Sequence, residues 1–358
     1  MTRLSKLKQS TRLVLLALFA VPFLLVTLHL GRMVLAPSRD ASIDAVRVRN
    51  ALVIELGLPS ETNWPPSAVP SAFNWESRIA PEPFVEVVES VLRDSPDGIT
   101  DFEKALLLSR HVRLNAREGR PIQANAWLTY QKLTSGQGGY CSDFTQTINA
   151  LGLAAGLQVR EWGFAWESFA NGHAFNEIWE PSLQKWVLLD SHHGFYVVDS
   201  ASGVPLSALE FRDHLMTEAD PASVRLVPIS EETFDERRIG NERAFYASGA
   251  PRFFLLMGNN VYSYDAHPLV QITEDLPRSI EMLTAILLGE HPRFLYVPPI
   301  ERPDLKQEVE AMAWIRHRTL IEIALGAVTG LAIVLLLLSF LTSDRSKRRE
   351  PEVSRRPV

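Results

Sequence analysis

The fold is decided by residues 138–160, which read GGYCSDFTQTINALGLAAGLQVR. After the two glycines, Phe144 and Ile148 follow Cys141 at the spacing of one helix face, and Gly156 supplies a stop. We therefore expect a helix that begins at Cys141 and buries one apolar stripe. The cysteine then lies at the helix N-terminus, where backbone amides and the peptide dipoles point outward.

Strand patterns follow this helix. Apolar alternation between turn signals predicts strands at residues 158–165, 172–180, 185–190 and 194–199. A turn at 181–184 makes the second and third strands an antiparallel hairpin with Glu180 opposite Lys185. In that register, His173 and Asp190 are diagonal neighbours, about 7–8 Å apart in an ideal ladder. A helix at 101–116 precedes these elements, so the expected fold class is α+β.

Cys141 is the only cysteine of the chain, which excludes an intrachain disulfide and an all-cysteine metal site. A lone cysteine is more often a small buried hydrophobe than a nucleophile. A helix N-terminus, however, favours the thiolate, and its unpaired amides can hold an oxyanion. His173 can exchange protons with the sulfur and the leaving group, while Asp190 fixes the orientation of the imidazole. The predicted catalytic residues are Cys141, His173 and Asp190.

Three segments together resemble the core of the transglutaminase-like superfamily, which has a papain-like cysteine fold: residues 138–160, GHAFNEIW at 172–179 and KWVLLD at 185–190. The resemblance covers roughly residues 98–200. It implies a helix that carries Cys141 packed on an antiparallel sheet, with His173 on the next strand and Asp190 one strand later.

The resemblance also implies a function. Cys141 would attack a peptide or carboxamide carbonyl and form a thioester, with no cofactor. Transfer to water gives proteolysis or deamidation, and transfer to an amine gives cross-linking; the residues do not distinguish these outcomes. Substrates could be proteins, peptides or peptidoglycan stem peptides. The alternative is a catalytically inactive transglutaminase-like module that binds or scaffolds a partner in a cell-envelope or polysaccharide assembly.

Other polar and aromatic residues near the motif have two interpretations each. His192 and His193 suggest a metal site, but neighbouring strand residues point to opposite faces, so no metal site is expected. Gln137 is either an oxyanion donor or an ordinary loop residue. Glu177 shares a face with the histidine of the motif, although a salt bridge at a sheet edge explains it equally well. Trp162 lines a substrate groove or packs in the core.

Two apolar stretches without Lys, Arg, Asp or Glu, at residues 13–30 and 323–343, predict membrane helices at 13–30 and 320–343. Each approaches the roughly 20 residues that cross a bilayer. The first stretch could be a cleaved signal peptide. Its apolar run is longer than usual for one, and no A-x-A-like site follows before Arg32, so an uncleaved anchor is favoured.

Charge predicts the topology. Basic residues dominate the tails 1–12 and 344–358, so both tails are expected in the cytoplasm and residues 31–319 on the periplasmic or extracellular side of the inner (plasma) membrane. The tails can also attract anionic lipid. The outer segment carries a formal charge of about −12 once the tails and spans are set aside, which argues against a nucleic-acid partner.

The outer segment is expected to have three parts. Residues 31–97 are rich in proline and read as a linker or N-terminal extension, with a helix at 84–93. Residues 98–200 form the core described above. Residues 201–319 form an accessory region whose role the sequence does not show.

Overall fold

Two units make up the protein. The structure is a computed structural model and describes residues 9–35, 39–117, 119–122, 124–166, 169, 171–217, 220–230, 236–274, 276, 278–299 and 303–347. Chain contacts divide it into a larger unit, Ile43–Ala313, and a smaller one that combines Met1–Ser42 with Trp314–Val358.

The smaller unit pairs two apolar helices, α1 (Gln9–Leu35) and the second half of α12 (Pro303–Lys347). Arg12 near the start of α1 donates to the Ser339 carbonyl oxygen at 3.2 Å, and His29 near its end lies 3.5 Å from Glu322. The two segments are therefore antiparallel. Windows at Ser10–Arg32 and Leu305–Leu341 are long and apolar enough to cross a membrane, so both predicted spans fall on suitable helices.

The larger unit contains the remaining elements. Its helices are α2 (Arg39–Val53, which begins in the smaller unit), α3 (Glu82–Leu92), α4 (Asp101–Asn115), α5 (Ala126–Thr134), α6 (Cys141–Ala154), α7 (Ala208–Met216), α8 (Glu236–Gly249), α9 (Val261–Asp265), α10 (Pro268–Thr273) and α11 (Arg278–Leu288). Its strands are β1 (Ile54–Leu56), β2 (Val159–Ala165), β3 (Gly172–Glu180), β4 (Lys185–Asp190), β5 (Phe195–Asp199), β6 (Val224–Pro228), β7 (Phe253–Leu256) and β8 (Phe294–Tyr296).

These strands form one eight-stranded sheet in the order β1-β8-β7-β2-β3-β4-β5-β6. Every pair is antiparallel except β1 and β8. The α+β class is confirmed. The sheet extends beyond residues 98–200, because β7 pairs with β2 and β6 pairs with β5. These flanking strands cover what would otherwise be the open edges of the predicted core.

The hairpin of β3 and β4 has the predicted register. Glu180 lies opposite Lys185, and Asn176 lies opposite Leu189. Side chains alternate between the two faces of the sheet, so His173 and Asp190 project to the same face as Glu177. The predicted helix at 101–116 is α4, which begins with a capping box between Thr100 and Glu103.

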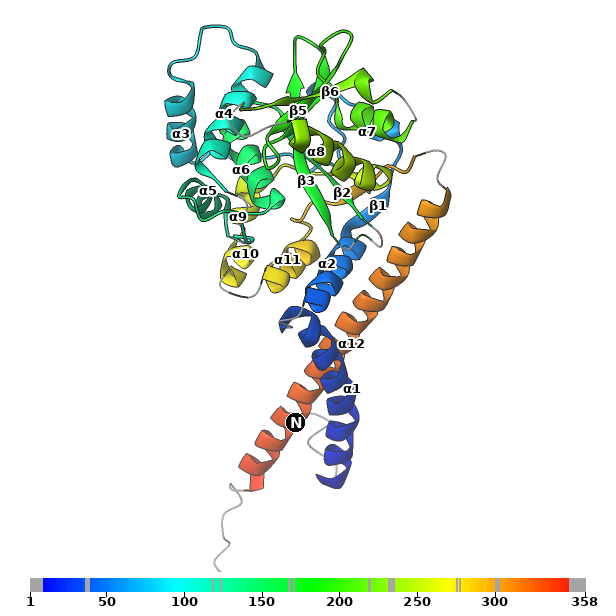
Figure 1. The fold of residues 1–358 in the computed structure, drawn as a ribbon. Coiled ribbons are helices and arrows are strands. Elements are labelled where there is room, and N and C mark those ends of the chain that lie inside the picture. The colour runs from blue at the N-terminus through cyan, green and yellow to red at the C-terminus, as the bar shows by residue number, and fades with distance from the viewer. Residues whose placement is uncertain are drawn as a thin grey trace, which may run out of the picture. The chain divides into compact units, whose positions relative to one another are not determined.

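Helices cover both faces of the sheet (Figure 1). One core contains side chains of α3, α4, α5 and α6 with Ile178 and Val187 of the sheet. The other contains the opposite face of the same strands, including Phe175, together with Phe211 of α7 and Tyr246 of α8. The strands around His173 are thus buried on both sides, which fixes their side chains in place.

Most of the proline-rich segment 31–97 belongs to the larger unit and packs within it. Trp64 is only 5 % exposed, and its carbonyl oxygen accepts from the Trp186 indole at 2.7 Å. Prolines here start short helices, as Pro66 does, rather than keeping the chain extended. The helix expected at 84–93 is α3.

Candidate active site

Cys141 is the first residue of α6 and is partly exposed. Gly138, at a φ of +79°, turns the chain into the helix, a conformation that favours glycine. Gly139 donates to the Arg117 carbonyl oxygen at 2.9 Å. The Tyr140 amide donates to Asp143 Oδ2 at 2.8 Å, which ties the chain before the cysteine to the first helical turn. The helix start is therefore held from both sides of the cysteine.

Packing fixes α6 against β3. Phe144 and Ile148, the predicted stripe, are buried. The Asn176 amide on β3 donates to Asn149 Oδ1 of α6 at 2.9 Å. These contacts set the position of the helix relative to the strand that carries the histidine.

His173 and Asp190 are hydrogen-bonded, with 2.8 Å between Nε2 and Oδ2, and both side chains are buried. Gly172 allows β2 to approach the start of β3, because a Cβ there would lie 1.9 Å from the Phe164 carbonyl oxygen. The His193 amide donates to Asp190 Oδ1 at 2.9 Å. The diagonal gap expected from the register is thus closed by side-chain reach, and the carboxylate is held at both oxygens.

Tyr246 on α8 is a member of this site that the sequence did not suggest. Its hydroxyl donates to Asp190 Oδ2 at 2.7 Å, and its side chain is fully buried. Asp190 Oδ2 therefore accepts hydrogen bonds from both the His173 ring and the neutral Tyr246 hydroxyl. The two residues are 56 positions apart in the chain, and no local pattern around Tyr246 marks the contact.

Electrostatics link the three predicted catalytic residues. Burial lowers the pKa of His173, but the charge and hydrogen bond of Asp190, with a further hydrogen bond to Cys141, raise it overall to about 10. Burial raises the pKa of Asp190, and the positive His173 outweighs this and holds the pKa well below its usual range. At neutral pH the pair is an imidazolium and a carboxylate. The structure thus joins His173 to Asp190 by a hydrogen bond and places Cys141 where it interacts electrostatically with His173.

His192 and His193 lie in the turn between β4 and β5, not on a strand. The alternation that argued against their acting together does not apply there. One ring nitrogen from each of His173, His192 and His193 lies within 4.8 Å of the other two. His193 Nδ1 contacts the Glu242 carboxylate, while burial lowers the pKa of His192 to about 3 and keeps it neutral.

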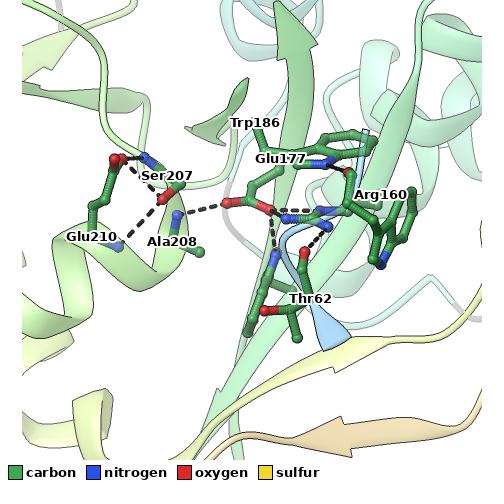
Figure 2. Close-up of polar contacts among 9 residues, drawn as sticks. Thr62, Arg160, Glu177, Trp186, Ser207, Ala208 and Glu210 are labelled. Atoms are coloured by element: carbon green, nitrogen blue, oxygen red, sulfur yellow. Dashed lines mark hydrogen bonds and ion pairs between the residues drawn. The ribbon is translucent and has the colours of Figure 1, made fainter. Parts of the chain in front are cut away.

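Glu177 forms a buried ion pair with Arg160 rather than a salt bridge at a sheet edge. Its carboxylate accepts from Arg160 Nε at 2.7 Å, the Trp162 indole at 2.5 Å and the Ala208 amide at 2.6 Å (Figure 2). The guanidinium lies 4.1 Å from the Trp186 ring centroid. This network joins β2, β3 and the start of α7, and it is structural support for the strand that carries His173.

Two other candidates have different positions. Trp162 is completely buried in the core that includes Phe175, so it packs and does not line a groove. Gln137 is exposed in the loop before α6.

Comparisons of the chain with models of protein families, with curated proteins and with solved structures find no match. The function is therefore inferred from the residues of the site itself.

Proposed function

We propose that this protein is a membrane-anchored thiol acyltransferase or hydrolase of the transglutaminase-like type. The observation that carries the proposal is the position of His173, whose Nε2 lies 2.8 Å from Asp190 Oδ2 and whose pKa is raised by both Asp190 and Cys141. Nucleophile, proton carrier and orienting carboxylate are the three groups that covalent acyl transfer requires.

The chemistry follows from these contacts. The imidazolium of His173 stabilises a thiolate on Cys141 by its charge. The sulfur attacks the carbonyl carbon of a peptide or carboxamide, and the developing oxyanion faces the first-turn amides of α6. The C–N bond then breaks as His173 gives its proton to the leaving amine, which leaves a thioester on Cys141. Water or a second amine attacks the thioester, passes a proton to His173 and regenerates the thiolate.

Asp190 supports both halves of the cycle. It keeps the imidazole in one orientation through Nε2, while Tyr246 and the His193 amide hold the carboxylate. Because the side chains of His173, Asp190 and Tyr246 are buried, little reorganisation accompanies the proton transfers.

The location of the site is part of the proposal. If α1 and α12 cross the inner membrane, their antiparallel packing places both basic tails on one side. The positive-inside rule then puts the tails in the cytoplasm and the larger unit outside, facing protein, peptide or peptidoglycan-stem substrates.

Trapping of the acyl-enzyme tests the function. The detergent-solubilised full chain is incubated with peptides, peptidoglycan stem peptides among them, and hydroxylamine, which converts a thioester into a hydroxamate. We expect hydroxamate from the wild type and none from Cys141→Ala. Equal hydroxamate from both proteins would contradict the proposal. If the wild type binds peptide stoichiometrically but forms no hydroxamate, the scaffold alternative would be favoured.

A further inference from the structure

Three histidines gather beside the predicted nucleophile, and the acyl-transfer mechanism uses only one of them. Ring centroids lie 4.4 Å apart for His173 and His193, 4.9 Å for His192 and His193, and 5.6 Å for His173 and His192. We call these three residues the histidine cluster.

Carboxylates already orient two members of the cluster. Asp190 holds His173 at Nε2, and Glu242 contacts His193 at Nδ1. Proteins use the same arrangement at metal centres, where a carboxylate on one ring nitrogen fixes the tautomer and directs the opposite nitrogen to the metal. The second pair, His193 with Glu242, has no role in the proposed acyl transfer.

The third member carries an unsatisfied atom. Nδ1 of His192 is buried and has no hydrogen-bond partner among the described residues. The ring packs edge-on against Phe144 on α6, with centroids 5.1 Å apart. A buried nitrogen without a partner costs roughly 1–3 kcal/mol. A metal ion bound to this nitrogen would remove that cost.

We propose that the histidine cluster binds a divalent transition-metal ion, with Zn²⁺ as the best match. Three imidazoles and an open fourth position are a common zinc environment. Zn–N bonds of about 2.0–2.1 Å in a tetrahedron place nitrogens about 3.4 Å apart. The present separations of up to 4.8 Å therefore need to close by at most about 1.4 Å. His192 and His193 lie in a turn, where small ring and backbone adjustments suffice.

Metal binding would inhibit the proposed enzyme reversibly, and this part of the inference rests on the proposed function. His173 Nε2 is bonded to Asp190, and the ring also interacts electrostatically with Cys141. A metal ion on the other nitrogen displaces the proton that the imidazolium carries there, and this removes the proton carrier from the sulfur. Metal binding itself needs no reactive thiol.

Co²⁺ titration tests the site, because four-coordinate Co²⁺ has strong visible absorption. The full chain in detergent is stripped with a chelator and titrated with Co²⁺, then with Zn²⁺ in competition. We expect one equivalent of Co²⁺, displaced by Zn²⁺. Affinity should fall at least about 10-fold in His192→Ala and in the shape-preserving His192→Phe. Cys141→Ser and the distant control His214→Ala should keep the wild-type affinity.

The outcomes separate the two proposals. No stoichiometric Co²⁺ in the wild type, or unchanged affinity in both folded His192 variants, overturns the metal site whatever the thiol does. Zn²⁺ should slow alkylation of Cys141 in the wild type but not in His192→Phe, and equal slowing in both proteins would overturn inhibition through this cluster. Co²⁺ binding to a chain that fails the hydroxylamine test would retain the metal site and reject the enzyme.

Discussion

The buried ion pair of Arg160 and Glu177 allows a quantitative prediction. Glu177→Gln keeps the size and shape of the side chain and removes its charge. The carboxylate accepts four donors, two from Arg160, one from the Trp162 indole and one from the Ala208 amide. Glutamine offers one oxygen, so its NH₂ group must face a donor on one side of the network.

Two costs then apply to the folded state. The guanidinium of Arg160 is buried, and without its partner it becomes an uncompensated charge; breaking such a pair costs about 3–5 kcal/mol. Stacking on the Trp186 ring and the hydrogen bond to the Thr62 carbonyl oxygen remain, which favours the lower end of that range. We expect a loss of about 3–4 kcal/mol in the free energy of unfolding of the larger unit.

Urea unfolding of the full chain in detergent measures this loss, with tryptophan fluorescence as the readout because three tryptophans surround Arg160. Glu210→Gln is the matched control. Glu210 is half-exposed and pairs with Lys185, so the same substitution there should cost less than about 1 kcal/mol. A loss below about 1 kcal/mol for Glu177→Gln, with an unchanged urea dependence, would refute the assignment of this pair as the main polar support of β3.

Further predictions follow from the site and its surroundings. Tyr246→Phe removes one donor from a buried carboxylate and should cost about 1.5–3 kcal/mol in urea unfolding, whereas a neutral result would mean that the contact to Asp190 is not formed. Gly172→Ala brings a Cβ to 1.9 Å from the Phe164 carbonyl oxygen and should lower the free energy of unfolding by at least about 1–3 kcal/mol. Gly240→Ala, on an open part of α8, should instead raise it by up to about 1 kcal/mol. A Gly172→Ala protein more stable than Gly240→Ala would contradict the packing at β2 and β3. The raised pKa of His173 means that this residue stabilises the folded state fully below pH 6.5 and that the stabilisation is lost as the pH rises through about 10. The difference in unfolding free energy between wild type and His173→Gln should therefore shrink between these pH values. A constant difference would argue against the ion pair. A membrane-impermeant maleimide should label Cys141 on intact spheroplasts, and labelling only after lysis would reverse the proposed topology.

The hairpin could be predicted from the sequence because its information is local. Alternating side chains gave the strands, the turn at 181–184 set the register, and that register brought His173 close to Asp190. The helix that begins at Cys141 could also be predicted from the sequence, since its apolar residues repeat at helical spacing. Periodicity of this kind depends only on neighbouring residues.

The remaining contacts depend on residues that are distant in the chain. Tyr246 reaches Asp190 only because α8 packs on the sheet, and β7 joins β2 across almost 90 intervening residues. Strands of three or four residues, such as β1, β7 and β8, are too short to show alternation. His192 and His193 were treated as strand residues whose rings point to opposite faces, whereas both lie in the turn between β4 and β5. The expectation that their rings do not converge was wrong for that reason.

Alkylation of Cys141 by iodoacetamide across pH tests the central claim most directly. The chain has one cysteine, so the label reports on that thiol alone. We predict that the wild type is alkylated faster than His173→Ala at neutral pH, because the positive His173 ring favours the thiolate, which is the reactive form. Superimposable pH profiles for the two proteins would contradict the account, because they would show that His173 does not act on the sulfur.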